Sequence, residues 1–279
     1  MTKLSTTPIP PWVLVLGAGG SGKTRLLGTF CEYVPTVIIT ADLKGLQTIK
    51  TMGLDPEYFL VEDWSKIWNV YEDVARYCKD NAVKCIALDD ITKVQDTDIE
   101  KSMKQPQNWN ERNQASKGTA NFELQVMKDT MEGNRRLELQ QRGNMNIGLD
   151  AFITQIFKLA PPIKVMTALE DLREHPRTGQ EHLYPLVEGG LRYELPSEFS
   201  LVINTFVYED KGAQFYCATS RSNSRLSTKD RYSLTGGRTW INPTGEKLLA
   251  YMAGKGEKET KLEADIGVGM IAKPTRVNN

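Results

Sequence analysis

Short apolar runs alternate with segments of helical periodicity through the first 170 residues of the chain. The apolar runs are Trp12 to Leu16, Val37 to Thr40, Phe59 to Val61, Cys85 to Leu88 and Ile163 to Ala168. Between them apolar residues recur at helical spacing, as at Leu26, Phe30 and Val34. Strands that alternate with helices imply right-handed crossovers and a parallel sheet covered on both faces. The pattern therefore predicts an α/β fold with a mainly parallel sheet flanked by helices.

The pattern changes in the second half of the chain. Gln, Asn, Lys and Glu dominate residues 96–142, which predicts a polar, partly helical and mobile insertion. After an amphipathic helix and the strand ending at Ala168, a polar loop is expected up to residue 200. The runs 201–208 and 214–219 then predict late antiparallel strands joined by a hairpin turn. We expect an extended leader over 1–11, one core over 12–253 and a flexible tail over 254–279.

One glycine-rich stretch stands between the first apolar run and the first helical segment. Its residues are Gly17, Ala18, Gly19, Gly20, Ser21, Gly22, Lys23 and Thr24, followed by Arg25. Gly17 and Gly22 let such a loop curl so that backbone N–H groups cradle a polyphosphate. Lys23 would reach the β- and γ-phosphates, and Thr24 would offer its hydroxyl to Mg²⁺. A chance glycine-rich turn is disfavoured by the full pattern in this context, so ATP and Mg²⁺ are the expected cofactors.

An aspartate follows the fourth apolar run. Asp89 comes directly after four apolar residues, in the pattern of a carboxylate that holds the Mg²⁺ shell from a strand end. Thr24 and Asp89 are thus the expected metal residues. Asp90 either shares that work or caps the helix after it.

Two further residues follow predicted strands. Asp42 comes after the second strand, where a carboxylate can orient the water that attacks a γ-phosphate. The alternative is that Asp42 caps the helix beginning at Leu43. Thr167 lies near the end of a later strand and either senses the γ-phosphate or is a buried strand threonine.

Two groups of basic residues are candidates for contacts with phosphate. Lys229 and Arg231 lie in a basic run, and two residues apart in an extended segment they would point the same way. They either supply a cation to a neighbouring subunit or a DNA backbone, or belong to a solvated loop. Arg135, Arg136 and Arg142 in the insertion are better placed for DNA, with a solvated helix as the default.

The composition limits the classes of partner. Thirty-five basic and 35 acidic residues cancel over the 279 residues, so no global field favours nucleic acid or membrane. The four cysteines show no C-x-x-C spacing, and His175 and His182 lie apart from all of them, which favours reduced thiols over a disulfide framework or zinc site. We expect no signal peptide, no transmembrane helix and a cytoplasmic location.

Taken together, LGAGGSGKT, ITADLKGLQTI, CIALDDITKV, VMTALED and STKDR resemble the phage nucleotide-binding proteins of the AAA_24 type. These are RecA-like P-loop NTPases that include Sak-type recombination and single-strand annealing proteins. The resemblance spans about residues 12 to 235. The family often carries Glu where this chain has Asp42, and a His shortly before the Glu that matches Glu170, where this chain has Leu169.

The resemblance implies a Mg²⁺-dependent ATPase that acts on single-stranded DNA in phage-type recombination, annealing or replication, in the cytoplasm of a host cell. It implies a homo-oligomer, a ring or a filament, with Lys229 and Arg231 at the subunit interface, and a phage single-strand-binding protein as a further partner. The alternative is a nucleotide-dependent assembly or packaging factor that acts on a protein and hydrolyses weakly or not at all. A small-molecule kinase is a third possibility.

Overall fold

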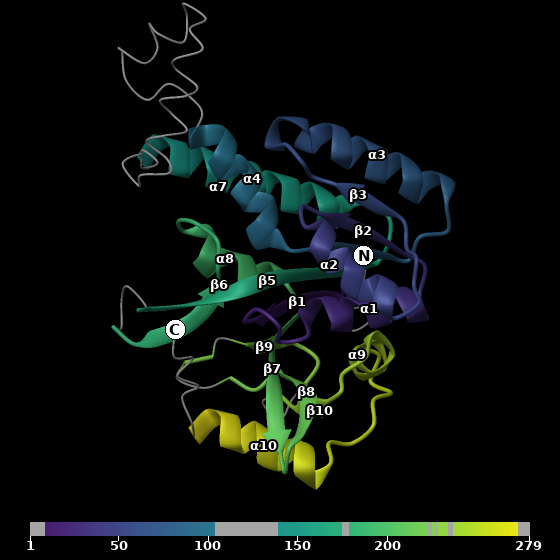
Figure 1. Ribbon diagram of the computed structural model, residues 1–279, viewed down its shortest axis with the longest axis vertical. Helices are drawn as coiled ribbons and strands as arrows, with labels where there is room; N and C mark the ends of the chain where they lie inside the picture. The colour runs from purple at the N-terminus through teal and green to yellow at the C-terminus, as the bar shows by residue number, and fades with distance from the viewer. Residues whose placement is uncertain are drawn as a thin grey trace, which may run out of the picture.

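The strands of the protein assemble into one large mixed sheet (Figure 1). The structure is a computed structural model, and it describes residues 9–103, 139–174, 179–222, 225–226, 228–233 and 237–272. Within these residues the strands are β1 (Trp12–Gly17), β2 (Thr36–Thr40), β3 (Tyr58–Leu60), β4 (Cys85–Asp89), β5 (Ile163–Glu174), β6 (Glu181–Pro185), β7 (Leu201–Asp210), β8 (Ala213–Thr219), β9 (Lys229–Asp230) and β10 (Thr239–Ile241).

The strand order decides the fold class. Along its main path the sheet runs β10-β8-β7-β1-β5-β4-β2-β3, while β6 pairs with β5 and β9 pairs with β7. The six strands from β7 to β3 on this path are parallel, and β6, β8, β9 and β10 pair antiparallel. Strand β5 lies between β1 and β4, so β1 is an inner strand of the sheet with parallel neighbours on both sides. The predicted parallel sheet with late antiparallel strands is confirmed.

Helices cover both faces of the sheet. They are α1 (Lys23–Tyr33), α2 (Leu43–Thr51), α3 (Ile67–Asp80), α4 (Ile91–Met103), α7 (Leu139–Lys158), α8 (Leu191–Glu198), α9 (Gly245–Met252) and α10 (Lys261–Ala272), with a short 3-10 turn at Trp64–Lys66. Leu14 and Leu16 of β1 pack in one core with α3, α4, α7 and α8. Val13 and Val15 point to the opposite face, in a core with α1 and α9. The alternation along β1 thus orients the strand that precedes the glycine-rich loop.

The turn between β7 and β8 consists of two residues. Lys211 and Gly212 have φ values of 50° and 81°, and Asp210 pairs with Ala213 across the turn. A two-residue connection with both φ values positive matches the twist of the flanking strands. The predicted late hairpin is confirmed, with both strands longer than expected.

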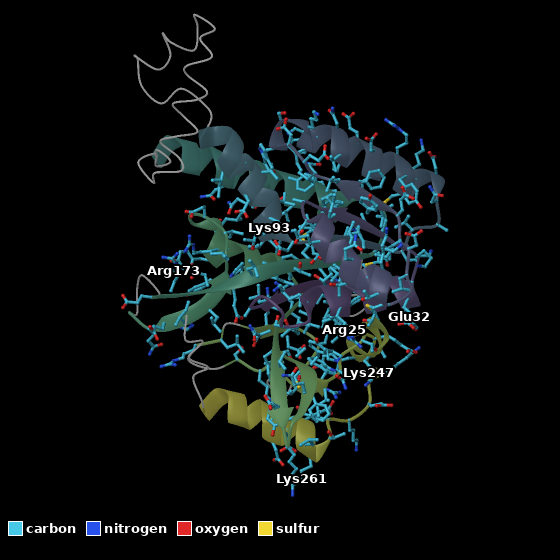
Figure 2. All side chains as sticks on the ribbon, viewed as in Figure 1. Arg25, Glu32, Lys93, Arg173, Lys247 and Lys261 are labelled. Atoms are coloured by element: carbon cyan, nitrogen blue, oxygen red, sulfur yellow. The ribbon has the colours of Figure 1, made fainter. Side chains whose placement is uncertain are left out.

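The expected polar loop between residues 169 and 200 is wrong. Strand β5 continues to Glu174 and pairs with β6 as a two-stranded ribbon beyond the main sheet, and α8 follows. Arg173, labelled in Figure 2, pairs with Asp171 on this ribbon. The ribbon has no continuous apolar run because its outer residues are exposed, so periodicity alone does not reveal it. His182 lies in β6, and His175 lies outside the described residues.

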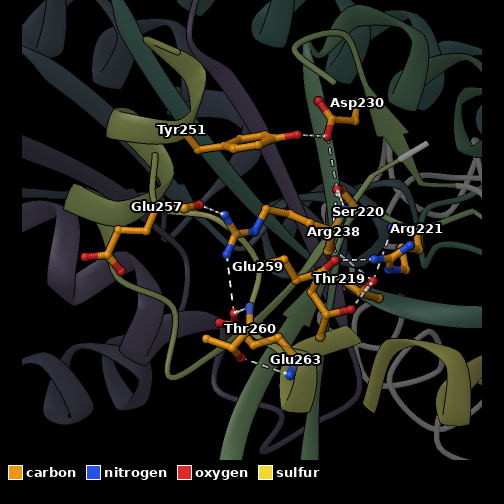
Figure 3. A network of polar contacts seen from close by, with 11 residues as sticks. Thr219, Ser220, Arg221, Asp230, Arg238, Tyr251, Glu257, Glu259, Thr260 and Glu263 are labelled. Atoms are coloured by element: carbon orange, nitrogen blue, oxygen red, sulfur yellow. Dashed lines mark hydrogen bonds and ion pairs between the residues drawn. The ribbon is translucent and has the colours of Figure 1, made fainter. Parts of the chain in front are cut away.

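Residues 254–272 include helix α10 and contact the main sheet, while the flexibility expected for 254–279 stays a prediction. The carboxylates of Glu259 and Glu263 accept the backbone N–H groups of Thr239 and Ile241 in β10, at 2.7 and 3.2 Å. They also pair with Arg221 and Arg238 (Figure 3). An edge strand presents unpaired N–H groups, and here acidic side chains satisfy them. Charges that suggest a solvated tail therefore hold it against the sheet.

The polar insertion falls largely outside the described residues. Residues 96–103 belong to α4 and residues 139–142 to α7, so the insertion starts and ends within helices. Arg135 and Arg136, and most of the leader at 1–8, lie outside the described part. The predictions made for them stay predictions.

Candidate nucleotide-binding site

The glycine-rich loop leaves the carboxyl end of β1 and turns into α1. Gly20 and Gly22 have φ values of 76° and 95°, which side-chain-bearing residues rarely adopt. Gly22 is the N-cap of α1, and no side chain caps the helix there. The first N–H groups of α1 and the positive end of its dipole therefore face the loop, as anion binding requires.

Strand β7 holds the base of the loop. The hydroxyls of Ser21 and Thr205 lie 2.8 Å apart, and Thr205 donates to the carbonyl oxygen of Leu16 at 3.0 Å. A Cβ at Gly17 would come within 2.4 Å of both hydroxyl oxygens, so only glycine permits this approach. No role was predicted for Thr205, although a polar Asn-Thr pair inside an otherwise apolar strand is a visible signal in the sequence.

Lys23 lies inside the loop. Lys23 is only 7% exposed, and its Nζ donates to the carbonyl oxygens of Gly17 at 2.7 Å and Ala18 at 2.9 Å. Burial lowers the pKa of Lys23. The negative charges of nearby acidic side chains, of which Asp90 has the largest effect, oppose this shift. The carbonyls and carboxylates thus keep a cation where a phosphate would bind.

Asp89 accepts hydrogen bonds from two of the other predicted residues. Thr24 Oγ1 donates to Asp89 Oδ2 at 2.9 Å, and Thr167 Oγ1 donates to Asp89 Oδ1 at 2.6 Å. Burial raises the pKa of Asp89, and the two hydroxyl donors and Lys23 oppose that shift. The structure therefore brings Thr24, Asp89 and Thr167 together, with Thr167 in contact with the carboxylate itself.

The surroundings of Thr24 and Asp89 fit a magnesium ion. Both offer oxygen atoms, which Mg²⁺ prefers. Helix α2 passes this point with Gly45, where a Cβ would lie 3.1 Å from Asp89 Oδ2 and 3.9 Å from Thr24 Oγ1. The glycine keeps side-chain atoms away from the two oxygens. Thr24 and Asp89 are the residues that would hold the ion.

Two other acidic residues act as helix caps. Asp42 Oδ1 accepts the backbone N–H of Lys44 at 2.9 Å and caps α2, which is the alternative that the sequence left open. Asp90 Oδ1 accepts the backbone N–H of Lys93 at 2.7 Å at the start of α4. Burial, assisted by the charge of Asp89, raises the pKa of Asp90 to about 6. Capping engages one oxygen of each carboxylate, so the catalytic role of Asp42 stays a prediction.

Glu170 is a site residue that the sequence analysis did not assign. It follows the point where β5 runs beside the end of β1, and Asn204 Nδ2 of β7 donates to Glu170 Oε2. The backbone N–H of Ala18 in the loop also donates to this carboxylate. Burial raises the pKa of Glu170, and Asn204 and the charge of Lys23 oppose the shift. A carboxylate thus faces the phosphate loop from β5.

Lys229 and Arg231 lie away from the loop of their own chain. Both donate to the carbonyl oxygen of Ser197, at 2.6 and 3.2 Å, so they do point the same way. Lys229 pairs with Val202 near the start of β7, while the loop begins at the level of Thr205. The two cations therefore belong to the amino end of the sheet.

The cysteines do not offer a nucleophile. Cys31, Cys78, Cys85 and Cys217 are free thiols, and burial raises the pKa of each. In the described part of the chain no group of three or more His, Cys, Asp or Glu residues is arranged to hold a metal ion. The described helices include none that is long and apolar enough to cross a membrane.

No family model matches the sequence, and no curated protein matches it. The flagellar accessory protein FlaH from Methanocaldococcus jannaschii has a similar structure, with 10% identity, a TM-score of 0.37 and coverage of 83% of this chain and 86% of FlaH. A KaiC-like protein from Pyrococcus horikoshii OT3 is 14% identical, with a TM-score of 0.42 and coverage of 83% of this chain and 84% of its own. The fold class follows from the order and direction of the strands in this chain.

Proposed function

We propose that the chain is a Mg²⁺-dependent RecA-like ATPase of the AAA_24, Sak type that acts on single-stranded DNA. The observation that carries the ATPase proposal is the meeting of Lys23, Thr24 and Asp89 at the carboxyl ends of β1 and β4. A buried cation, free helix N–H groups and a buried carboxylate with a hydroxyl partner are what a nucleoside triphosphate and its metal require.

The chain's own residues divide the work of phosphoryl transfer. The loop N–H groups bind the phosphates, and Lys23 neutralises charge that develops on the transferred group. Thr24 and Asp89 would hold Mg²⁺, which supplies positive charge to the phosphate oxygens when it is bound. Thr167 keeps the Asp89 carboxylate in place through its hydrogen bond.

Hydrolysis needs a carboxylate that orients the attacking water. We assign this to Asp42, whose Oδ2 is not the oxygen that caps α2 and which follows β2, the strand beside β4. Glu170 has a different task in this proposal. Because it accepts the N–H of Ala18, an incoming phosphate competes with it for the same donor, so Glu170 responds to the presence of the phosphate.

A shared site between subunits follows from the position of Lys229 and Arg231. They cannot serve their own loop from the amino end of the sheet, so we propose that they serve a neighbour's in a ring or filament. A cation supplied in trans is worth about three to five orders of magnitude in turnover. A Lys229→Ala, Arg231→Ala protein should bind ATP but hydrolyse it poorly, and mixing it with Lys23→Ala protein should restore part of the activity. Failure of rescue in confirmed mixed oligomers contradicts a shared site.

The DNA role rests on the motif resemblance, and so does a phage single-strand-binding protein as partner. The deciding experiment measures ATP turnover with and without single-stranded DNA. Strong stimulation supports the proposal. ATP turnover that does not change with DNA favours the alternative, an assembly or packaging factor with a protein partner. Transfer of phosphate to an acceptor other than water identifies a kinase.

A further inference from the structure

An exposed tyrosine lies directly beside the phosphate loop. Tyr216 of β8 is 39% exposed, yet its ring is so near the loop that a Cβ at Gly22 would come within 2.6 Å of Tyr216 Cδ1. The guanidinium of Arg25, labelled beside α1 in Figure 2, lies over this ring at 5.4 Å from its centroid. One aromatic surface thus borders both the last glycine of the loop and the first turn of α1.

An exposed aliphatic side chain lies beside this ring on the neighbouring strand. Val207 of β7 is the direct cross-strand partner of Tyr216 and is 43% exposed. The next residues of β8, Cys217 and Ala218, are buried in the core. The exposed pair therefore extends the sheet outward beside the loop, as an aromatic ring next to a branched aliphatic side chain. A charged phosphate gains nothing from contact with such a surface, whereas a flat heteroaromatic ring can stack on it.

We propose that Tyr216 is the platform on which the base of the bound nucleoside triphosphate stacks. This inference rests on the proposed function, because it places the base of the same ligand whose phosphates the loop holds. The loop and the first N–H groups of α1 bind the phosphates, so the ribose and base leave the site near the first turn of α1. Tyr216 and Arg25 lie at that exit.

When the base binds, the guanidinium of Arg25 moves from its position over the Tyr216 ring. Its side chain is exposed, so its movement disrupts little buried structure. A planar guanidinium can stack on the outer face of the base or contact a phosphate. Stacking of this kind tolerates every base, because each has an aromatic face. The platform therefore selects nucleoside triphosphates over inorganic polyphosphate, rather than one base over another.

Tyr216→Ala separates base binding from phosphate binding. We expect the Kd for ATP to rise roughly 5- to 150-fold, the range that corresponds to loss of one base–aromatic stack. The Kd for inorganic tripolyphosphate, which has no base, should stay unchanged. Both are measured by calorimetry on the full-length protein with the same Mg²⁺ concentration. Tyr216→Phe keeps the ring and should keep the affinity for ATP.

Tyr33→Ala is the matched control, since Tyr33 is an exposed tyrosine (52%) at the other end of α1. It should change neither Kd. If Tyr216→Ala weakens ATP and tripolyphosphate equally, Tyr216 shapes the loop through Gly22, and the platform is refuted. No change in either Kd refutes it as well. A wild-type protein that binds tripolyphosphate as tightly as ATP overturns the platform alone, whereas one that binds neither overturns the proposed function with it.

Discussion

The hydroxyl of Thr205 should support both the stability of the protein and its affinity for nucleotide. Thr205→Val removes this hydroxyl and keeps the branched shape of the side chain. The residue is 3% exposed, so water cannot replace the contacts with Ser21 at 2.8 Å and Leu16 at 3.0 Å. Two lost hydrogen bonds cost about 1 kcal/mol each, and the stranded Ser21 hydroxyl adds about 1 kcal/mol. We expect a loss of about 2–3 kcal/mol, with a shift in Tm of about 2 °C for each kcal/mol.

Urea unfolding measures the loss of stability, and calorimetry with ATP measures the loss of affinity that follows when Ser21 is released. Thr205→Ser is the control, because it keeps the hydroxyl and removes only a methyl group, so its affinity for ATP should be retained. A double-mutant cycle with Ser21→Ala should give a coupling energy of about 1 kcal/mol. Strict additivity of the two changes, or normal ATP affinity in Thr205→Val, would refute the idea that β7 anchors the loop.

The remaining predictions concern charged groups. Asp89→Asn should reduce Mg²⁺-dependent ATP turnover far more than Mg²⁺-free nucleotide binding, because only the metal site loses its charge; equal losses would assign Asp89 to structure. Asp42→Asn should lower kcat by about 10²–10⁴ with ATP affinity retained, whereas Glu170→Gln, which removes a negative charge beside the phosphates, should bind ATP more tightly; the reverse pattern exchanges their roles. Lys164 is 1% exposed, and burial lowers its pKa from 10.5 to about 8, so between these pH values the folded state holds fewer protons than the unfolded chain. The free energy of unfolding should therefore rise with pH across that window, by up to roughly 3 kcal/mol more in the wild type than in Lys164→Met. Urea unfolding of both proteins at pH 8 and pH 10 measures this, and an equal change with pH in the two proteins would contradict it.

Local signals in the sequence predict much of the fold. The loop from Gly17 to Thr24 lies between a strand and a helix as its pattern requires, because glycine at set positions and the run of apolar residues before it act locally. Asp89 ends β4 beside Thr24, since the carboxyl ends of parallel strands meet at one edge of the sheet. The residue types and their spacing are therefore enough to predict these site residues from the sequence.

Other contacts depend on residues far apart in the chain, so the sequence does not reveal them. Thr205 is separated from Ser21 by 184 residues, and only the pairing of β1 with β7 brings them together. The same holds for Glu170 and Asn204. In the sequence, Glu259 and Glu263 look like charges of a solvated tail, because their partners on β10 lie about 20 residues away in the chain. Tertiary pairing decides such positions, not local propensity.

The most direct test of the central claim compares wild type with Lys23→Ala in equilibrium binding of ATP. Lys23 donates only to carbonyl oxygens of the loop in the hydrogen bonds that the structure describes, so its removal should leave the fold intact by circular dichroism and thermal unfolding. We expect the wild type to bind ATP tightly and the well-folded variant to have lost this binding. Equal affinity in both proteins would contradict the assignment of the loop as a phosphate-binding site.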